Sequence, residues 1–293
     1  MSIANQFSQF CENLRVPQAT RSSISDRYEN ITKRLNRDFW ESESKTLHSL
    51  YVGSYGRRTA VRGFSDLDVL FKLPYEIYKK YNSYQHNGQS ALLQAVKQSL
   101  KKTYSTTDIS GDGQVIVINF NDDISFEIVP CFSNPDNSFT YPDSNNGGSL
   151  KTTDPIPEIA TIKENNELTN KNLIRLCRMT RAWRNKWNVP MGGLLIDTLA
   201  NNFLINWKYK EKSYMYYDWM SRDFFAYLSN QNPQKEYWLA VGSKQYIHRK
   251  GNFEYKAKQS YKLALEAIEY ESKGMNYSAA QKWREIYGTD YPN

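Results

Sequence analysis

Two aspartates with one residue between them, Asp66 and Asp68, lie in an apolar run that follows the pair Gly53-Ser54 after about a dozen residues. In a β-strand the side chains of residues i and i+2 project from the same face, so both carboxylates would point the same way. Two such carboxylates repel each other unless a cation lies between them. A Gly-Ser turn offers backbone N–H groups and a hydroxyl to phosphate. Metal beside phosphate is the arrangement of nucleotidyl transfer, which is the chemistry that these residues predict.

A third carboxylate is expected on a neighbouring strand, because two-metal nucleotidyl transfer uses two carboxylates to bridge the ions and a third to complete the nucleophile's site. Glu127 is the candidate, since its two apolar neighbours in the chain would point the opposite way, into the core. The rivals Asp122 and Asp123 fall between two predicted strands, where aspartate is ordinary turn chemistry. The predicted catalytic and metal-binding set is therefore Asp66, Asp68 and Glu127.

Several arginines are placed where they could reach phosphate. Arg57 and Arg58 follow the Gly-Ser turn closely, although exposure on the surface would be as ordinary for them. Arg178 and Arg181 lie on the polar side of a helix predicted further along the chain, where a solvated surface is the common role. The residues alone leave both readings open.

The elements that would position these residues follow from the spacing of apolar side chains. Apolar residues recur at three- and four-residue steps from residue 18 to about 47, which predicts one long amphipathic helix. The first half otherwise predicts strands over 67–73, 114–120 and 124–132, the last two as a hairpin, and a helix over 90–104. Residues 149–169 are expected to form an extended crossover. The second half predicts helices from 170 to 187 and over 194–207, 257–268 and 278–287.

Composition and charge limit the number of domains, the cellular compartment and the kind of binding partner that the sequence allows. At 293 residues and 40% hydrophobic content, the chain can form one large domain or two, and no apolar run is long enough to span a membrane. The three cysteines are widely separated, with no metal-type spacing, which fits a reducing cytoplasm. The net charge is −2 over residues 1–170 and +9 over residues 171–293, a polarity that suits a polyphosphate substrate or nucleic acid.

The sequence resembles the core of the bacterial cGAS/DncV-like nucleotidyltransferases in the stretches GSYGRRTA, SDLDVLFKLP and FEIVPCF. These enzymes are relatives of metazoan cGAS and oligoadenylate synthetase within the DNA polymerase β-like superfamily. It also resembles their helical half in NKNLIRLCRMTRAWRNKW, GGLLIDTLANNFL, GNFEYKAKQSYKLALEAI and KWREIYG. The resemblance implies a bilobed α+β fold: a spine helix and catalytic core over residues 1–165, and an α-helical lobe over residues 166–293.

The same resemblance implies an enzyme that joins two or three nucleoside triphosphates, ATP and GTP among them, into a cyclic oligonucleotide. A purine cyclic dinucleotide is the expected product, a second messenger that activates a separate effector in anti-phage defence (CBASS). The expected cofactor is a pair of Mg²⁺ ions, with Mn²⁺ as a substitute. A regulatory protein is a possible partner, whereas a membrane is not expected. The chain lacks the clustered His and Cys of a zinc thumb, which argues against activation by DNA through such a device. A nucleic-acid activator is otherwise not required or unknown, and activation by RNA or by a protein stays open.

Carried over residue by residue, the resemblance assigns Gly53 and Ser54 to a substrate phosphate and the three carboxylates to two Mg²⁺ ions. It assigns the triphosphate tail to a basic residue matching Arg181 or Arg178. Many relatives have Asp where Glu127 stands, and glutamate is one methylene longer but still an oxygen ligand for Mg²⁺. This departure affects the expected metal geometry and leaves the expected activity class unchanged.

Three other functions use the same sequence features. A template-independent nucleotidyltransferase that extends RNA 3′ ends would share the core and would require an RNA primer. A nucleotidyltransferase that modifies proteins or drugs would leave the helical half unexplained. A catalytically inactive nucleic-acid-binding module is disfavoured by the three carboxylates, which would repel a phosphate backbone.

Overall fold

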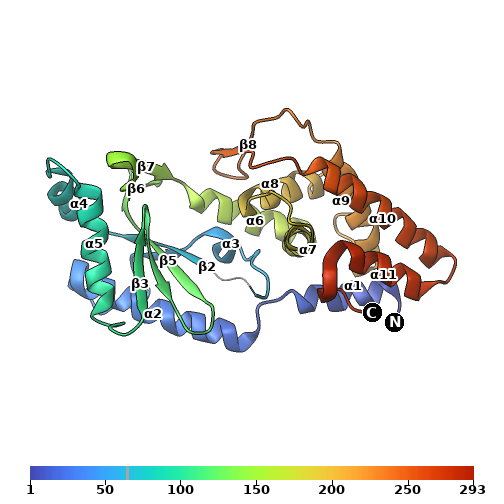
Figure 1. Ribbon diagram of the computed structural model, residues 1–293, viewed down its shortest axis with the longest axis horizontal. Helices are drawn as coiled ribbons and strands as arrows, with labels where there is room; N and C mark the ends of the chain where they lie inside the picture. The colour runs from blue at the N-terminus through green and yellow to red at the C-terminus, as the bar shows by residue number, and fades with distance from the viewer. Residues whose placement is uncertain (64–65) are drawn as a thin grey trace. The chain divides into compact units, whose positions relative to one another are not determined.

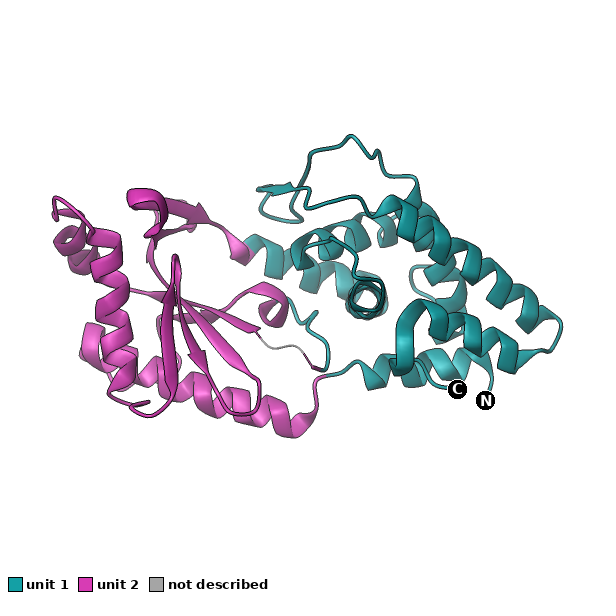
Figure 2. Cartoon of the chain, in the orientation of Figure 1, with its two compact units in different colours: residues 1–15, 57–62, 157–293 teal, residues 16–56, 63–156 magenta. Residues whose placement is uncertain are grey.

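The computed structural model describes residues 1–63 and 66–293. The first residue of the SDLD stretch, at position 65, and the residue before it therefore lie outside the described residues. The contacts divide the chain into two units (Figure 2). The helical unit consists of Met1–Arg15, Arg57–Arg62 and Pro157–Asn293, and the sheet unit of Val16–Gly56 and Gly63–Ile156. The resemblance implies a single boundary between two domains, after residue 165. In the structure the chain passes between the two units four times.

The sheet unit is built on a mixed sheet with the strand order β1-β2-β5-β4-β3 (Figure 1). β2 and β5 are parallel, and the other neighbours are antiparallel. β5 continues into a pairing with β6, which pairs in turn with β7. The strands are β1 (Ser49–Tyr51), β2 (Asp66–Lys72), β3 (Asp108–Asp112), β4 (Val115–Asn119), β5 (Ser125–Ser133), β6 (Phe139–Asp143) and β7 (Ser149–Thr153).

One face of this sheet is apolar and is packed by two helices, α2 (Gln18–Trp40) and α5 (Gly88–Lys101). Their buried residues form one hydrophobic cluster with alternate residues of β2, β4 and β5. This arrangement confirms the expected strands, the hairpin of β4 and β5, and the expected helix near residues 90–104. α2 ends earlier than expected, because Glu41 adopts a left-handed conformation (φ 52°) and its N–H bonds back to the carbonyl of Asn36. The unit is completed by α3 (Gly53–Gly56) and α4 (Tyr75–Asn82).

The helical unit has a separate core, and its first helix is α1 (Ile3–Asn13) at the N-terminus. Phe7 and Phe10 of α1 are fully buried against Tyr291 near the C-terminus, at ring distances of 5.1 and 5.4 Å. These contacts are the physical reason that the first fifteen residues belong to this unit. Its other elements are α6 (Pro155–Leu168), α7 (Asn172–Trp187), α8 (Gly193–Leu204), α9 (Tyr217–Ser229), α10 (Glu254–Ser272), α11 (Asn276–Tyr287) and the hairpin of β8 (Tyr237–Leu239) and β9 (Tyr246–His248).

The expected extended crossover over residues 149–169 is wrong beyond β7, because Pro155–Leu168 forms the helix α6. Pro155 and Pro157 lie in the first turn of α6, where backbone N–H groups have no partner within a helix, so the prolines are accommodated. The four helices expected in the second half are confirmed as α7, α8, α10 and α11. Within residues 1–63 and 66–293, no helix combines the length and the apolar character that a bilayer crossing needs.

Candidate active site

The two predicted catalytic strands are hydrogen-bonded neighbours in the sheet. β2 and β5 run parallel with Asp68 opposite Glu127 and Asp66 opposite Ser125. Register partners in a parallel pair project from the same face, so the three carboxylates share the face opposite to the one packed by α2 and α5. Alternate residues point into the core, and Leu67 and Phe126 are completely buried there. The structure therefore brings Asp66, Asp68 and Glu127 together on one surface.

The Gly-Ser turn lies against the middle of β2. The N–H of Val52 donates to the carbonyl of Asp68 at 2.9 Å, and the next residue, Gly53, has a positive φ of 57°. A Cβ at Gly53 would overlap the carboxylate of Asp68, so only glycine permits this approach. Ser54 follows in the short helix α3. The turn predicted to bind phosphate is thus next to a carboxylate predicted to bind metal.

Glu127 is the carboxylate whose ionisation is affected by its neighbours on this surface. Burial raises the pKa of Glu127 above its usual range, and the negative charges of Asp68 and Asp66 raise it further. Asp112, at the end of β3, acts in the same direction. A divalent cation on this surface would relieve that repulsion.

The donor set suits Mg²⁺ in type, because all three side chains offer oxygen. In the described parts of the chain, no three His, Cys, Asp or Glu side chains lie close enough to enclose one ion. Mg²⁺ is usually held by one or two carboxylates together with water and substrate phosphates, not by a closed protein cage. A face with partly exposed carboxylates, beside a turn predicted to bind phosphate, fits that pattern.

Two further residues of this surface escaped the sequence analysis. The hydroxyl of Ser125 donates to Asp66 Oδ1 at 3.2 Å, which orients that carboxylate. Asp112 lies on the same face as Glu127, as the register of β3, β4 and β5 shows. The sequence signal for Asp112 is weak, because β3 is short and Ile109 is its one buried residue.

The rival carboxylates are in the turn where the sequence placed them. Asp122 accepts two hydrogen bonds from Arg27 of α2, both at 2.9 Å, and Asp123 has a positive φ of 61°. The Arg27 guanidinium lowers the pKa of Asp122. These are structural contacts of a β-turn, and they leave Glu127 as the carboxylate beside Asp68.

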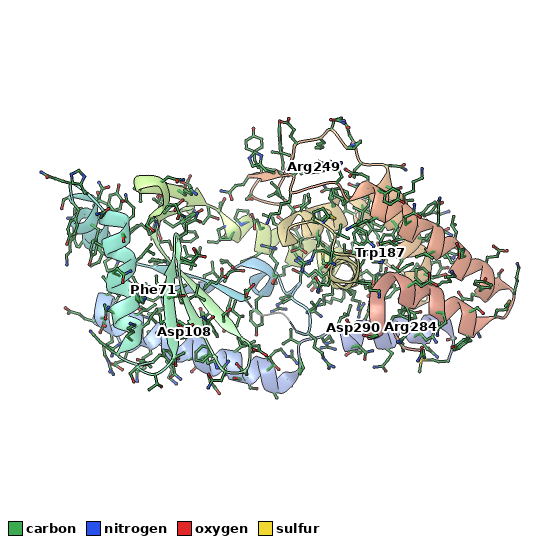
Figure 3. The ribbon with its side chains drawn as sticks, viewed as in Figure 1. Phe71, Asp108, Trp187, Arg249, Arg284 and Asp290 are labelled. Carbon is green, nitrogen blue, oxygen red and sulfur yellow. The ribbon has the colours of Figure 1, made fainter. Side chains whose placement is uncertain are left out.

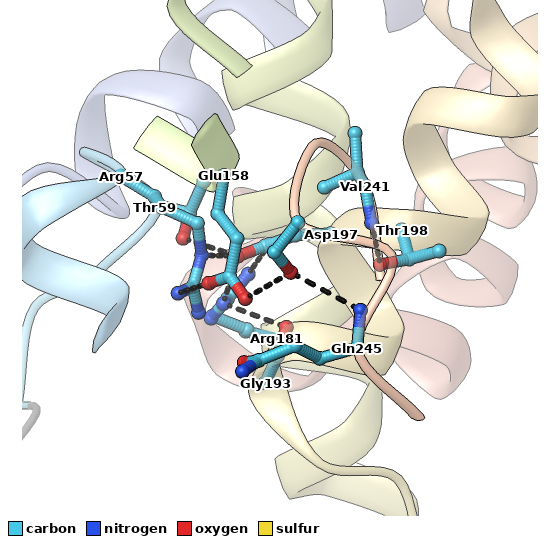
Figure 4. Close-up of polar contacts among 10 residues, drawn as sticks. Arg57, Thr59, Glu158, Arg181, Gly193, Asp197, Thr198, Val241 and Gln245 are labelled. Carbon is cyan, nitrogen blue, oxygen red and sulfur yellow. Dashed lines mark hydrogen bonds and ion pairs between the residues drawn. The ribbon is translucent and has the colours of Figure 1, made fainter. Parts of the chain in front are cut away.

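The arginines of the sequence analysis belong to the helical unit, and their contacts are with protein groups. Arg57 is buried and bonds Asp197, so it is neither exposed nor directed toward solvent. Arg181 is buried as well and donates to both carboxylate oxygens of Asp197, at 2.6 and 2.9 Å (Figure 4). Arg178 donates to the carbonyl of Arg58 at 2.8 Å. Asp197, in the middle of an apolar helix, was missed because its partners are distant in sequence.

Comparison with known proteins adds to this geometry. Over residues 1–166 the chain matches the family described as the Second Messenger Oligonucleotide or Dinucleotide Synthetase domain. A protein of Bacillus cereus (strain VD146) that bears the name "Probable cyclic nucleotide synthase" is 21% identical over 279 residues, which cover 82% of this chain and 81% of that protein.

Solved structures share the fold over nearly the whole chain. Escherichia coli MS115-1 CdnC, in a complex with HORMA-deltaN, has a TM-score of 0.70 at 15% identity and covers 99% of this chain and 98% of its own. Bradyrhizobium diazoefficiens CdnG, a CD-NTase in complex with GTP, has a TM-score of 0.67 at 10% identity, with coverages of 97% and 94%. Vibrio cholerae DncV, a cyclic AMP-GMP synthase, has a TM-score of 0.61 at 14% identity, with coverages of 84% and 69%. The expected α+β, polymerase β-like fold is thereby confirmed.

Proposed function

Since the chain belongs to the Second Messenger Oligonucleotide or Dinucleotide Synthetase family and is a nucleotidyltransferase, we propose that it makes a purine cyclic dinucleotide from nucleoside triphosphates. The observation that carries the proposal is the shared face of Asp66, Asp68 and Glu127, with Gly53 against Asp68. We propose two Mg²⁺ ions as the cofactor, with Mn²⁺ as a substitute, because the donors are all oxygen and the site is open on one side.

Each residue of the surface has a role in this proposal. Asp66 and Asp68 would hold the ions, and Glu127 would be the third carboxylate of the site. Bound Mg²⁺ supplies a lowered pKa for that hydroxyl and neutralises charge on the departing pyrophosphate. The backbone N–H groups of the Gly53-Ser54 turn and the Ser54 hydroxyl bind a substrate phosphate beside the ions. The turn and the carboxylates together align nucleophile and phosphorus, which is where most of the rate of such reactions originates.

The triphosphate role of Arg178 and Arg181 stays a prediction from the resemblance. Both guanidinium groups donate to protein oxygens, Arg178 to the Arg58 carbonyl and Arg181 to Asp197. Binding a triphosphate would require those bonds to be shared or exchanged. The proposal therefore rests on the sheet unit and does not depend on these two residues.

The choice of ATP and GTP is supported by the bound nucleotides of related folds, since CdnC was solved with ATP and CdnG with GTP. The role in CBASS anti-phage defence, with a separate effector that senses the product, follows from the resemblance to bacterial enzymes of that system. A regulatory protein is part of the proposal, because CdnC was solved with HORMA-deltaN. The three cysteines are free and buried, which supports a location in the reducing cytoplasm.

The test is a product assay with the full chain. The purified protein is incubated with four labelled nucleoside triphosphates and Mg²⁺ or Mn²⁺, without nucleic acid, and the products are treated with phosphatase and resolved. We expect a phosphatase-resistant species, because a cyclic product has no terminal phosphate. Omission of one triphosphate at a time identifies the bases.

The same assay separates the alternatives. A species that forms only when an RNA primer is added, and that lengthens the primer, would replace the proposal with RNA 3′-end nucleotidyl transfer. Labelled protein in place of a small product would indicate a protein-modifying enzyme. A resistant species that persists when Asp66 and Asp68 are both changed to Asn would contradict the assigned site.

A further inference from the structure

The segment Arg57–Arg62 follows the α3 turn directly, yet it belongs to the helical unit. Thr59 and Val61 are buried, and Val61 lies in the hydrophobic cluster of that unit. The N–H of Arg62 donates to the carbonyl of Leu14, the residue that caps α1, at 2.9 Å. The chain therefore leaves the proposed phosphate-binding turn, enters the core of the helical unit, and returns toward the strand that carries the metal-binding carboxylates.

A buried ionic cluster holds the start of this segment (Figure 4). Arg57 donates from Nε to Asp197 Oδ2 at 2.8 Å and from Nη1 to Glu158 Oε2 at 3.2 Å. The Thr59 hydroxyl donates to the same oxygen of Asp197 at 2.9 Å. Arg181 completes the cluster from α7 by bonding both oxygens of Asp197. All five side chains are less than a tenth exposed.

The charges of the cluster balance, with two guanidinium groups and two carboxylates. Burial alone would raise the pKa of Asp197, but Arg181 and Arg57 lower it to about 2. Buried ion pairs contribute little net stability, because the cost of desolvation offsets the attraction between the charges. The planar fork of an arginine does impose a direction on its partners. The cluster is therefore better suited to defining geometry than to adding stability.

A second contact holds the same segment one residue later. Arg58 has a left-handed backbone with φ 62°, a conformation that is unfavourable for a non-glycine residue. Arg178 donates to the carbonyl of Arg58 at 2.8 Å and so supports that conformation. Burial lowers the pKa of Arg178 to about 10, as expected for a guanidinium turned inward. A strained residue held from two sides, directly after a substrate-binding turn, is typical of a positioning element.

We infer that Arg57 and Asp197 are positioning residues of the active site, which set the place of the α3 turn through the peptide bond between Gly56 and Arg57. The inference rests on the proposed function, because it assigns a purpose to a turn that binds phosphate. Arg181 then acts through Asp197 and not on the substrate itself. A displacement of about 1 Å in such a turn is enough to cost about 100-fold in rate.

The test compares three variants of the full chain. Arg57→Lys keeps the charge and removes the fork, and Asp197→Asn keeps the shape and removes the charge. Glu254→Gln is the matched control, because Glu254 is 9% exposed and bonds Arg249 (labelled in Figure 3) at 2.8 Å in the same unit, away from the segment Arg57–Arg62. For each variant we measure the thermal midpoint, kcat, KM for the nucleoside triphosphate, and binding of labelled ATP with Mg²⁺ by equilibrium dialysis.

We expect Arg57→Lys and Asp197→Asn to raise KM and weaken ATP binding by about 10-fold or more, at temperatures where both remain folded. Glu254→Gln should lower the thermal midpoint with KM and ATP binding unchanged. If Asp197→Asn does not fold, Arg57→Lys decides the outcome. Wild-type kinetics and binding in Arg57→Lys would overturn the inference while leaving the proposed function intact.

Failure of the proposed function has a different signature. A wild-type chain that makes no product but binds ATP more tightly than Arg57→Lys would overturn the function and support the positioning role. A wild-type chain that neither makes product nor binds ATP would overturn both.

Discussion

Gly53 lies so close to Asp68 that the carboxylate occupies the space of a Cβ. The residue before Gly53 is also bonded to Asp68, since the N–H of Val52 donates to the carbonyl of Asp68 at 2.9 Å. The contact places a turn able to bind phosphate beside a carboxylate able to bind metal, at a separation that tolerates no intervening side chain.

Replacement of Gly53 by alanine should therefore impair catalysis strongly. The new Cβ would displace the Asp68 carboxylate, and the φ of 57° would strain the alanine. We expect a loss in kcat/KM of about 100-fold, measured in the cyclic-product assay. Gly274→Ala is the control, because Gly274 also has a positive φ (74°) but has open space around its Cβ position. Equal losses in both variants would show that strain, not the contact with Asp68, causes the effect.

The double change Asp66→Asn and Asp68→Asn should abolish product and preserve the fold. Asparagine keeps the volume of both side chains and removes the charges that would hold Mg²⁺. We expect product below detection and an unchanged circular dichroism spectrum. Asp122→Asn tests the rival assignment, and it should cost at most about 1 kcal/mol of stability, because it breaks a half-exposed pair with Arg27. Loss of product in Asp122→Asn would indicate that Asp122, and not only Asp66 and Asp68, takes part in catalysis.

Glu127→Gln should stabilise the metal-free protein while removing its response to metal. Burial and the charges of Asp68 and Asp66 raise the pKa of Glu127, so its ionised form is disfavoured in the folded state. A neutral side chain relieves that repulsion, and we expect a higher thermal midpoint in EDTA. Addition of Mg²⁺ with nucleotide should raise the midpoint of the wild type and of Glu127→Asp, but not of Glu127→Gln. If the thermal midpoint of Glu127→Gln in EDTA is lower than that of the wild type, the ionised Glu127 is stabilised by a partner and is not repelled by its neighbours.

The buried cluster predicts a specific loss of stability in acid. The pKa of Asp197 is lowered to about 2, so its stabilisation is complete above the pKa of about 3.9 of an unfolded aspartate. The stabilisation is lost as the pH falls from that value toward 2, by about 2 kcal/mol in total. Urea unfolding at pH 7, 4 and 2.5 should show a steeper decline for the wild type than for Asp197→Asn, because other carboxylates with lowered pKa values, such as Asp122 and Glu43, remain in both proteins. The variant is expected to be about 3–5 kcal/mol less stable at pH 7. Parallel declines in the two proteins would contradict the assignment.

The strands that carry the candidate carboxylates could be predicted from the sequence because the information is local. Asp68 and Glu127 alternate with residues that are fully buried, and period-two alternation identifies a strand and its faces without knowledge of the partner. The choice of Glu127 over Asp122 followed from turn chemistry, which the bond between Asp122 and Arg27 supports. The pairing of β2 with β5 could not be derived locally, and it was expected only because two-metal transfer needs a third carboxylate on a neighbouring strand.

The roles of the arginines could not be predicted from the sequence, because their partners lie far along the chain. Arg57 meets Asp197 across 140 residues, and helical periodicity assigns Arg181 to a polar face that is in fact buried against the same carboxylate. Phe7 illustrates the same limit in the core, since a short N-terminal segment shows its burial only when the C-terminal Tyr291 is in place. Charges paired across distant segments leave no signal in a single sequence.

The chain crosses between the two units four times, which limits how the units can be exchanged by recombination or by protein engineering. Dividing the sequence at a single position does not separate the units. Residues 157–293 alone lack α1 and the segment Arg57–Arg62 of the helical unit. Residues 16–156 alone lack the support that this segment receives from the helical unit. Recombination that exchanged one unit between two homologues would need matching breakpoints at all four crossings. The two units are therefore expected to descend together, and grafting a new helical unit onto this sheet requires transplanting three separate stretches of sequence at once.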